Sequence, residues 1–383
     1  MSLDSKELFS KSYSQDILRF TSEEKCTLIN SFWPQLNLSK HTYNDKKYAS
    51  LLNFWGLTLQ SLHPPNSRFA TEQWGGLLAI VGVLRSDRNS TRRELVAKIE
   101  SMYFKNFKNE PISGSIELAV QLWLGIHLHS NESPNLVKNP MDTCVSWADD
   151  QSLEKAIAAQ FSQHTKAAQS VQNCPLDTSF TAMGLKSTHG MNLLWTDSLV
   201  DHLKLEGSPG NRRLFIYRHK TCLVNHRSGS TPPIISADIL DEAIRTLDLL
   251  FPVGHKQTIA FLKKSGVQMW IENPSESLRA TELNEFVYWR SRLAQLLNLL
   301  NSRPETVLQA MKDTRHPVEF VKLWGAVFGV FLLTILFGVL STVYSAKQYN
   351  VAVDSYQLAL AQACCQQTSP LLPICAQSTA KLC

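Results

Sequence analysis

Two acid–base residues stand next to each other in the chain, in a pairing that is used for catalysis elsewhere. Asp201 and His202 lie within the sequence LVDHLKL, and a carboxylate that orients an imidazole is a common catalytic arrangement. The surrounding leucines predict a helix, however, and adjacent residues of a helix point about 100° apart. No Gly-x-Ser-x-Gly elbow accompanies the pair. We therefore expect Asp201 and His202 to be a solvated or helix-capping pair.

Two other histidines have a spacing that could hold a metal ion. His127 and His129 form a His-x-His sequence, and such a pair shares a face only in a strand. The surrounding pattern is helical, so we predict no metal site there. The sequence also has no Walker A loop, GxGxxG, HExxH or kinase motif set. We predict no catalytic, cofactor-binding or metal-ligating residue and no cofactor, and expect a protein that is not an enzyme, although the sequence leaves this open.

A short basic stretch, YRHKTCLVNHR, could contact an anionic lipid or a phosphorylated partner, but a polar strand followed by a loop explains it more simply. Its charged and titratable members are Arg218, His219, Lys220, His226 and Arg227. The 38 basic and 33 acidic residues give a net charge of +5, and this balance is too even to indicate nucleic-acid binding, which normally needs a clustered basic face.

Half of the eight cysteines fall in the C-terminal segment 364–383, at Cys364, Cys365, Cys375 and Cys383. On the non-cytosolic side of a membrane these thiols would form disulfides. In the cytosol, Cys364 and Cys365 would instead be candidates for palmitoylation. The tail has no CxxC and no histidine, so metal binding is not expected.

The elements that position these residues are mostly helical. Apolar residues recur at helical spacing in the segments 90–107, 113–128, 152–164, 192–206, 236–252, 281–301 and 304–313. Within them, the predicted buried faces include Leu95, Ile99 and Met102; Leu194, Leu199 and Leu203; and Ile239, Ala243, Leu247 and Leu250. Thr281 is a predicted N-cap. We expect the run 74–84 to be a buried helix or strand and the segment 129–143 to be a loop. LFIYRH (214–219) is a predicted short strand, and the segment 1–60 is predicted to form loosely packed helices.

One segment near the end of the chain has a different character. LWGAVFGVFLLTILFGVLSTVYS, residues 323–345, contains no charged residue, and its 23 residues would form a helix about 35 Å long against a hydrocarbon core of about 30 Å. Its 13 Leu, Val, Phe and Ile residues favour membrane insertion by roughly 4–8 kcal/mol. We therefore predict a transmembrane helix in contact with lipid, beginning at Pro317. Gly325 and Gly329 form a GxxxG sequence that would allow self-association.

The flanking charges predict how the helix is oriented. The flank before it, 303–322, contains Arg303, Lys312, Arg315 and Lys322, and the flank after it, 346–365, contains only Lys347. The positive-inside rule then places the N-terminal body in the cytosol and the tail in a lumen or outside the cell. The N-terminus resembles neither a signal peptide nor a transit peptide. The sequons at Asn37, Asn89 and Asn131 would be used only in the inverted topology.

The domain organisation follows from these elements. The predicted fold is mostly α, with one or two short strands in a cytosolic body and one C-terminal transmembrane helix. We assign residues 1–110 to an N-terminal helical region, 111–316 to the main helical body, 317–348 to the transmembrane helix with its flank, and 349–383 to a short Cys-rich tail.

Several segments together resemble a large family of uncharacterised single-pass membrane proteins of filamentous fungi. They are SIELAVQLWLGIHL, WADDQSLEKAIAAQF, FTAMGLKSTHGMNLLWTDSLVDHLKL, LFIYRHKTCLVNH, ILDEAIRTLDLLFP and FVYWRSRLAQL, which occur in this order before one late apolar segment. The resemblance covers roughly residues 112–350. It implies a fungal source and a helical cytosolic body, but no activity and no site residue. The family's Trp- and Arg-rich segment before the span is reduced here to Arg315 and Lys322, and the Cys-rich tail is not typical of the family.

These observations favour a membrane-tethered interaction or scaffold protein with an unknown protein partner. The alternatives are an unrecognised membrane-anchored enzyme and an accessory component of a fungal secondary-metabolite pathway. Convergence of Asp201, His202, His219 and His226 in one pocket would favour the enzyme.

Overall fold

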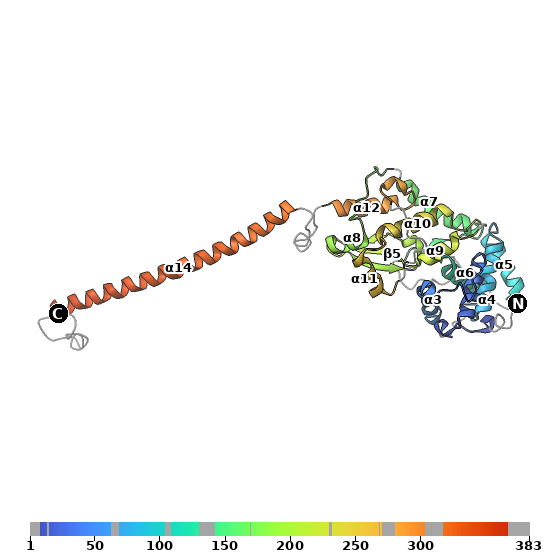
Figure 1. Cartoon of the computed structure of the whole chain (residues 1–383), viewed down its shortest axis with the longest axis horizontal. Coiled ribbons are helices and arrows are strands. Elements are labelled where there is room, and N and C mark those ends of the chain that lie inside the picture. Colours follow the sequence, from blue (N-terminus) through green and yellow to red (C-terminus); the bar gives the residue numbers. More distant parts are fainter. Residues whose placement is uncertain are drawn as a thin grey trace. The chain divides into compact units, whose positions relative to one another are not determined.

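The computed structural model describes residues 8–13, 15–62, 69–103, 109–129, 142–168, 170–229, 232–267, 269, 280–302 and 317–366. The chain divides into two compact units, residues 1–312 and residues 313–383, each of which is described by itself (Figure 1). The predicted loop 129–143 and the predicted short helix 304–313 lie almost entirely outside the described residues.

The first part of unit 1 is built from helices (Figure 1). They are η1 (Ile17–Arg19), α2 (Ser22–Phe32), η2 (Pro34–Leu36), α3 (Asp45–Gln60), α4 (Trp74–Ser86), α5 (Arg92–Tyr103) and α6 (Asn109–Leu124). Local signals define their starts: Thr21 and Glu24 form a capping box at α2, and the Asn44 side chain accepts from the first turn of α3. The apolar run 74–84 is the buried helix α4, as predicted, and it packs against α6.

The prediction that the segment 1–60 is loosely packed is wrong. The side chains of Trp33, Tyr48 and Trp55 are almost completely buried. Trp55 stacks on Phe32 with ring centroids 4.4 Å apart, and its Nε1 donates to the carbonyl of Leu122 at 2.9 Å. Large aromatic side chains therefore fix α2 and α3 to the end of α6, and this packing is not visible as sequence periodicity.

The second part of unit 1 mixes helices with short strands. Its elements are β1 (Leu128–His129), β2 (Val145–Ser146), α7 (Leu153–Ala168), α8 (Ala182–His189), β3 (Asn192–Thr196), η3 (Leu199–Asp201), β4 (Leu205–Glu206), β5 (Arg213–Tyr217), α9 (Lys220–Arg227), α10 (Ala237–Leu250), α11 (Lys256–Ser265), η4 (Leu283–Glu285) and α12 (Arg290–Asn301). β1 and β2 pair in parallel. β5 is the central strand of a three-stranded sheet, parallel to β3 and antiparallel to β4.

The segment 192–206 is not the predicted helix. Residues 192–196 form β3, which pairs with β5 along its whole length, and Leu203 has a left-handed backbone with φ 62°. A short apolar run such as LLW fits a strand as well as a helix, so only the pairing with β5 decides between them. The predicted strand 214–219 is confirmed in β5, but the basic stretch after it forms the helix α9 instead of a loop.

Two other helices start or end differently from the prediction. α6 ends at Leu124, before His127, and α12 begins at Arg290, so Thr281 is not its N-cap. Just before α12, the buried Glu242 carboxylate of α10 accepts hydrogen bonds from the backbone N–H groups of Val287 and Trp289 at 2.7 and 2.6 Å. This tertiary contact holds the backbone of residues 286–289 in a non-helical conformation, so α12 begins only at Arg290.

The helices predicted at 90–107, 152–164 and 236–252 are confirmed as α5, α7 and α10. Their apolar faces are buried as expected, except for Met102, which is 56% exposed near the end of α5. One continuous apolar core includes side chains from both 1–110 and 111–302.

Unit 2 contains the helix α14, Pro317–Gln366, which begins at Pro317 as predicted. Its segment Trp324–Gln366 is long and apolar enough to cross a membrane, and no other helix among the described residues meets that test. None of its most apolar part is buried inside the structure. The fold class, mostly α with few short strands and one long apolar C-terminal helix, is therefore confirmed. Cys364, near the end of α14, is disulfide-bonded.

Candidate functional site

The four residues whose convergence would favour an enzyme are all buried. Asp201 and His202 are 1% and 0% exposed, and His219 and His226 are buried as well. The expectation of a solvated or capping pair at Asp201 and His202 is therefore wrong. Both residues pack inside the core, where solvent does not reach them.

Asp201 and His202 form hydrogen bonds with different residues. The Asp201 carboxylate accepts from Thr143, at 2.9 Å from the backbone N–H and 2.6 Å from Oγ1. His202 Nδ1 accepts from the backbone N–H of Tyr217 at 3.2 Å, so Nε2 carries the proton and donates to Thr246 Oγ1 at 2.7 Å. Burial lowers the pKa of His202 to about 3. A neutral ring therefore links β5 to α10, which is a structural role.

A charged cluster lies where the parallel strands β3 and β5 end. Asp197 follows β3, and Arg218 and His219 follow β5. Arg218 donates to both oxygens of the Asp197 carboxylate, and His219 Nε2 lies 2.7 Å from Oδ1. Burial alone would raise the pKa of Asp197, but the hydrogen bonds and charges of His219 and Arg218 lower it below its usual value. Sequence reasoning missed Asp197, although a correct assignment of β3 would have placed it beside Arg218.

His127 and His129 have different surroundings. His127 Nδ1 lies 3.7 Å from Asp142 Oδ2, and its Nε2 lies 3.2 Å from Gln121 Nε2, while His129 belongs to β1. Burial lowers the pKa of His127, although Asp142 opposes this shift. Among the described residues, no group of three or more His, Cys, Asp or Glu side chains is arranged to hold a metal ion.

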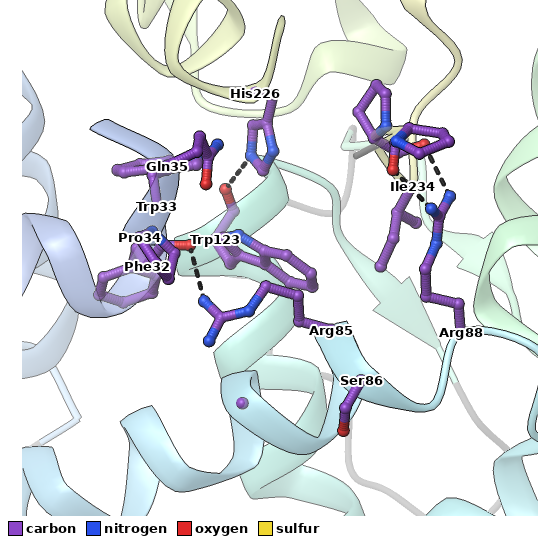
Figure 2. A pocket seen from close by; sticks show the side chains of 13 residues that line it. Phe32, Trp33, Pro34, Gln35, Arg85, Ser86, Arg88, Trp123, His226 and Ile234 are labelled. Atoms are coloured by element: carbon purple, nitrogen blue, oxygen red, sulfur yellow. Dashed lines mark hydrogen bonds between the residues drawn. The ribbon is translucent and has the colours of Figure 1, made fainter. Parts of the chain in front are cut away.

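His226 lines a cavity. The cavity has a volume of about 610 Å³ and lies between the 32–35 segment, α4, the end of α6, α9 and residues 232–234. Figure 2 shows its walls. His226 Nε2 donates to the carbonyl of Trp123 at 2.7 Å, and its ring meets Trp33 edge-on at a centroid distance of 5.3 Å. Burial lowers the pKa of His226 to about 4, so this ring is neutral near pH 7.

Two arginines supply the charge of the cavity, and they lie on different sides of it (Figure 2). Arg88 donates to the carbonyls of Pro232 and Pro233 and forms an ion pair with Glu154 at 3.2 Å. Arg85 donates to the carbonyls of Ser31 and Phe32 at 3.1 and 3.4 Å. No carboxylate of the described residues pairs with Arg85, and burial lowers its pKa. A guanidinium stays charged in proteins, so Arg85 brings an uncompensated positive charge to the wall.

The two tryptophans of the cavity also leave hydrogen-bonding capacity unused. Trp33 and Trp123 are 1% and 4% exposed, and neither indole N–H has an acceptor among the described residues. A buried donor without an acceptor costs about 1–3 kcal/mol. Among the lining side chains there is no carboxylate. The wall is therefore apolar and aromatic, rich in donors and positively charged at one point.

Sequence reasoning did not find this cavity. Arg85 and Arg88 follow an apolar run one helical turn apart, and Trp33 and Trp123 lie far apart in the chain, so no local spacing connects them. Comparison with known proteins gives no match: no family model fits the chain, and neither a curated protein nor a solved structure is similar to it.

Proposed function

We propose that this protein is a single-pass membrane protein that tethers a helical binding body to a membrane and acts through interaction instead of catalysis. The body lies in the cytosol and the tail in a lumen or outside the cell. The observation that carries the proposal is α14, whose apolar segment is long enough to cross a bilayer and is not buried by the rest of the structure. Exposed apolar area of this extent is stable only in contact with lipid or with another protein.

The orientation is supported from both ends of the segment. Basic residues are concentrated before it, whereas the flank 346–365 after it contains Lys347 alone. Beyond it, Cys364 is disulfide-bonded, and structural disulfides are typical of compartments outside the cytosol. The two arguments are independent, because one rests on charge and the other on thiol chemistry.

Interaction is favoured over catalysis because the buried histidines are engaged elsewhere. His202 links strand to helix, His219 contacts the Asp197 carboxylate, and His226 donates to a backbone carbonyl. The same body has a cavity of a size suited to a bound molecule. We further propose self-association through Gly325 and Gly329: an added Cβ at either would meet nothing within 4 Å, so a second helix can approach closely.

The topology is tested by glycosylation mapping of the full chain inserted into microsomes. Asn37 and Asn89 are exposed on the body, so their sequons are accessible to the glycosylation machinery if the body is lumenal. The variant Gln366→Asn creates a sequon with Thr368 at the other end of α14. We expect resistance to carbonate extraction, no mobility shift of the wild type after glycosidase treatment, and a shift for Gln366→Asn.

Two results would overturn the proposal in different ways. A shift of the wild type that disappears in the double variant Asn37→Gln/Asn89→Gln would show that the body is lumenal. Release of the wild type by carbonate would show that α14 does not anchor the protein at all.

A further inference from the structure

The cavity beside α4 has features that select one class of ligand. Its wall is formed largely by aromatic and aliphatic side chains, and its volume of about 610 Å³ is within the range of small-molecule sites. Phe32, Trp33 and Trp123 contribute to this wall, and an aromatic ring packs favourably against aromatic side chains. These features favour a compact ligand with an aromatic body.

The polar groups of the cavity specify the other end of that ligand. Arg85 contributes a positive charge that no described carboxylate neutralises. A guanidinium recognises a planar carboxylate through paired hydrogen bonds. The second cation, Arg88, is already compensated by Glu154. The single uncompensated positive charge of Arg85 therefore favours a ligand with a single negative charge.

We propose that this cavity binds a small aromatic monoanion, namely an aromatic carboxylate, with its ring against the aromatic and aliphatic wall and its carboxylate facing Arg85. The proposal goes beyond membrane tethering and does not depend on it, because every residue involved belongs to the body.

The test measures binding to the full chain in lipid nanodiscs by isothermal titration calorimetry, with empty nanodiscs as the blank. The probes are 2-naphthoate and its neutral analogue 2-naphthamide, which share a ring system and differ in charge. We expect the wild type to bind 2-naphthoate at least about tenfold more tightly than the amide, because hydrogen bonds to charged groups exceed neutral ones by that order. Equal affinity for both probes, or no binding of either at millimolar concentration, would overturn the proposal.

Three variants locate the ligand. Arg85→Gln keeps donors for the carbonyls of Ser31 and Phe32 but removes the charge, and we expect the preference for the carboxylate to fall to about twofold or less. Gly82→Leu should abolish binding of both probes, because Gly82 lines the cavity and a Cβ there meets nothing within 4 Å, so the side chain has room to enter. Trp123→Phe keeps a ring but makes one wall of the cavity smaller, so both probes should bind several-fold more weakly.

The control is Arg19→Gln, which removes an arginine whose side chain is 86% exposed and which is not part of the cavity wall. It should leave both affinities unchanged. If Arg85→Gln does not fold, Gly82→Leu and Trp123→Phe still decide the case, and unchanged binding in both contradicts the proposal. A peptide ending in Trp with a free carboxylate that binds more tightly than 2-naphthoate would also contradict it, because the occupant would then be a protein terminus.

Discussion

Two buried histidines in this protein are held neutral by their surroundings. His202 accepts from Tyr217 N–H and contacts Thr246, and His226 donates to the carbonyl of Trp123. Neither ring has a carboxylate as a hydrogen-bond partner, and burial lowers the pKa of His202 to about 3 and of His226 to about 4. The usual value is 6.5. Each ring therefore binds its proton more readily in the unfolded chain than in the folded one.

This difference predicts a loss of stability in acid. Between pH 6.5 and about 4 the unfolded state holds the additional protons, so the free energy of unfolding falls as the pH falls, by about 1.4 kcal/mol per pH unit for each ring. Above pH 7 these two rings contribute no slope. The measurement is chemical denaturation of the full chain in detergent at several pH values, followed by tryptophan fluorescence.

His202→Gln and His226→Gln should each reduce that slope by about 1.4 kcal/mol per pH unit, which corresponds to one proton. Each variant should also lower the free energy of unfolding at pH 7.5. The matched control is His41→Gln, because His41 is exposed and its loss removes a histidine without removing a buried one. A slope between pH 6.5 and 4 that is the same in all four proteins would contradict the assignment.

The helix α4 shows how closely neighbouring elements approach one another. It contains three glycines, at 75, 76 and 82. A Cβ at Gly76 would lie 2.1 Å from Thr71 Oγ1, whereas a Cβ at Gly82 would meet nothing within 4 Å. The same substitution within one helix is therefore expected to have opposite effects, and the cavity is the reason.

We expect Gly82→Ala to raise the free energy of unfolding by about 0.5–1 kcal/mol, because alanine restricts the unfolded chain and favours the helix without a steric conflict. Gly76→Ala is the matched control and should be destabilising, because Thr71 must move. Thermal unfolding of both variants in detergent checks the pair, and destabilisation by Gly82→Ala would show that the space beside α4 is filled.

Contacts between elements also set where α12 begins. Glu242→Ala should lower the free energy of unfolding by about 2–4 kcal/mol, because the backbone N–H groups of Val287 and Trp289 lose a charged acceptor inside the core. Its neighbour Asp241 pairs with Arg227, which is 60% exposed, so Asp241→Ala should change stability by less than about 1 kcal/mol. Similar losses in both variants would contradict this role of Glu242.

Local patterns therefore predict some elements of this fold and miss others for physical reasons. α10 and α14 are visible in the sequence because their apolar periodicity or length is set within the element. β3 is missed because its identity comes from pairing with β5, and the start of α12 is missed because Glu242 lies far away in the sequence, on α10. The cavity brings together Trp33, Arg85 and Trp123 from three separate segments, so no sequence spacing could indicate it.

At the scale of the whole molecule, the chain consists of a body with its own core and a helix whose apolar residues are exposed. The segment 323–345 favours insertion by roughly 4–8 kcal/mol, whereas one arginine at the centre of a span costs about 2.5–3.5 kcal/mol. A single charge is therefore not enough to prevent insertion, and two charges are needed.

The double variant Leu333→Arg/Leu336→Arg should move the protein from the carbonate-resistant membrane fraction to the soluble fraction, because the two substitutions together cost about 6–8 kcal/mol. The matched control is Ser355→Arg/Gln362→Arg, which adds the same charges to the same helix beyond the apolar segment. Membrane retention of the first variant would mean that α14 is not the anchor.

The length of α14 has a consequence for the chemistry at its far end. Cys364 lies well beyond Ser345, where the uncharged segment ends, and α14 continues without interruption to Gln366. At about 1.5 Å per residue, the helix carries this cysteine roughly 28 Å along its axis from the end of the span. On the proposed topology, α14 holds the disulfide at a distance from the lipid surface. Soluble oxidants and reductants of the lumenal or extracellular space, and not enzymes embedded in the bilayer, would then control its redox state.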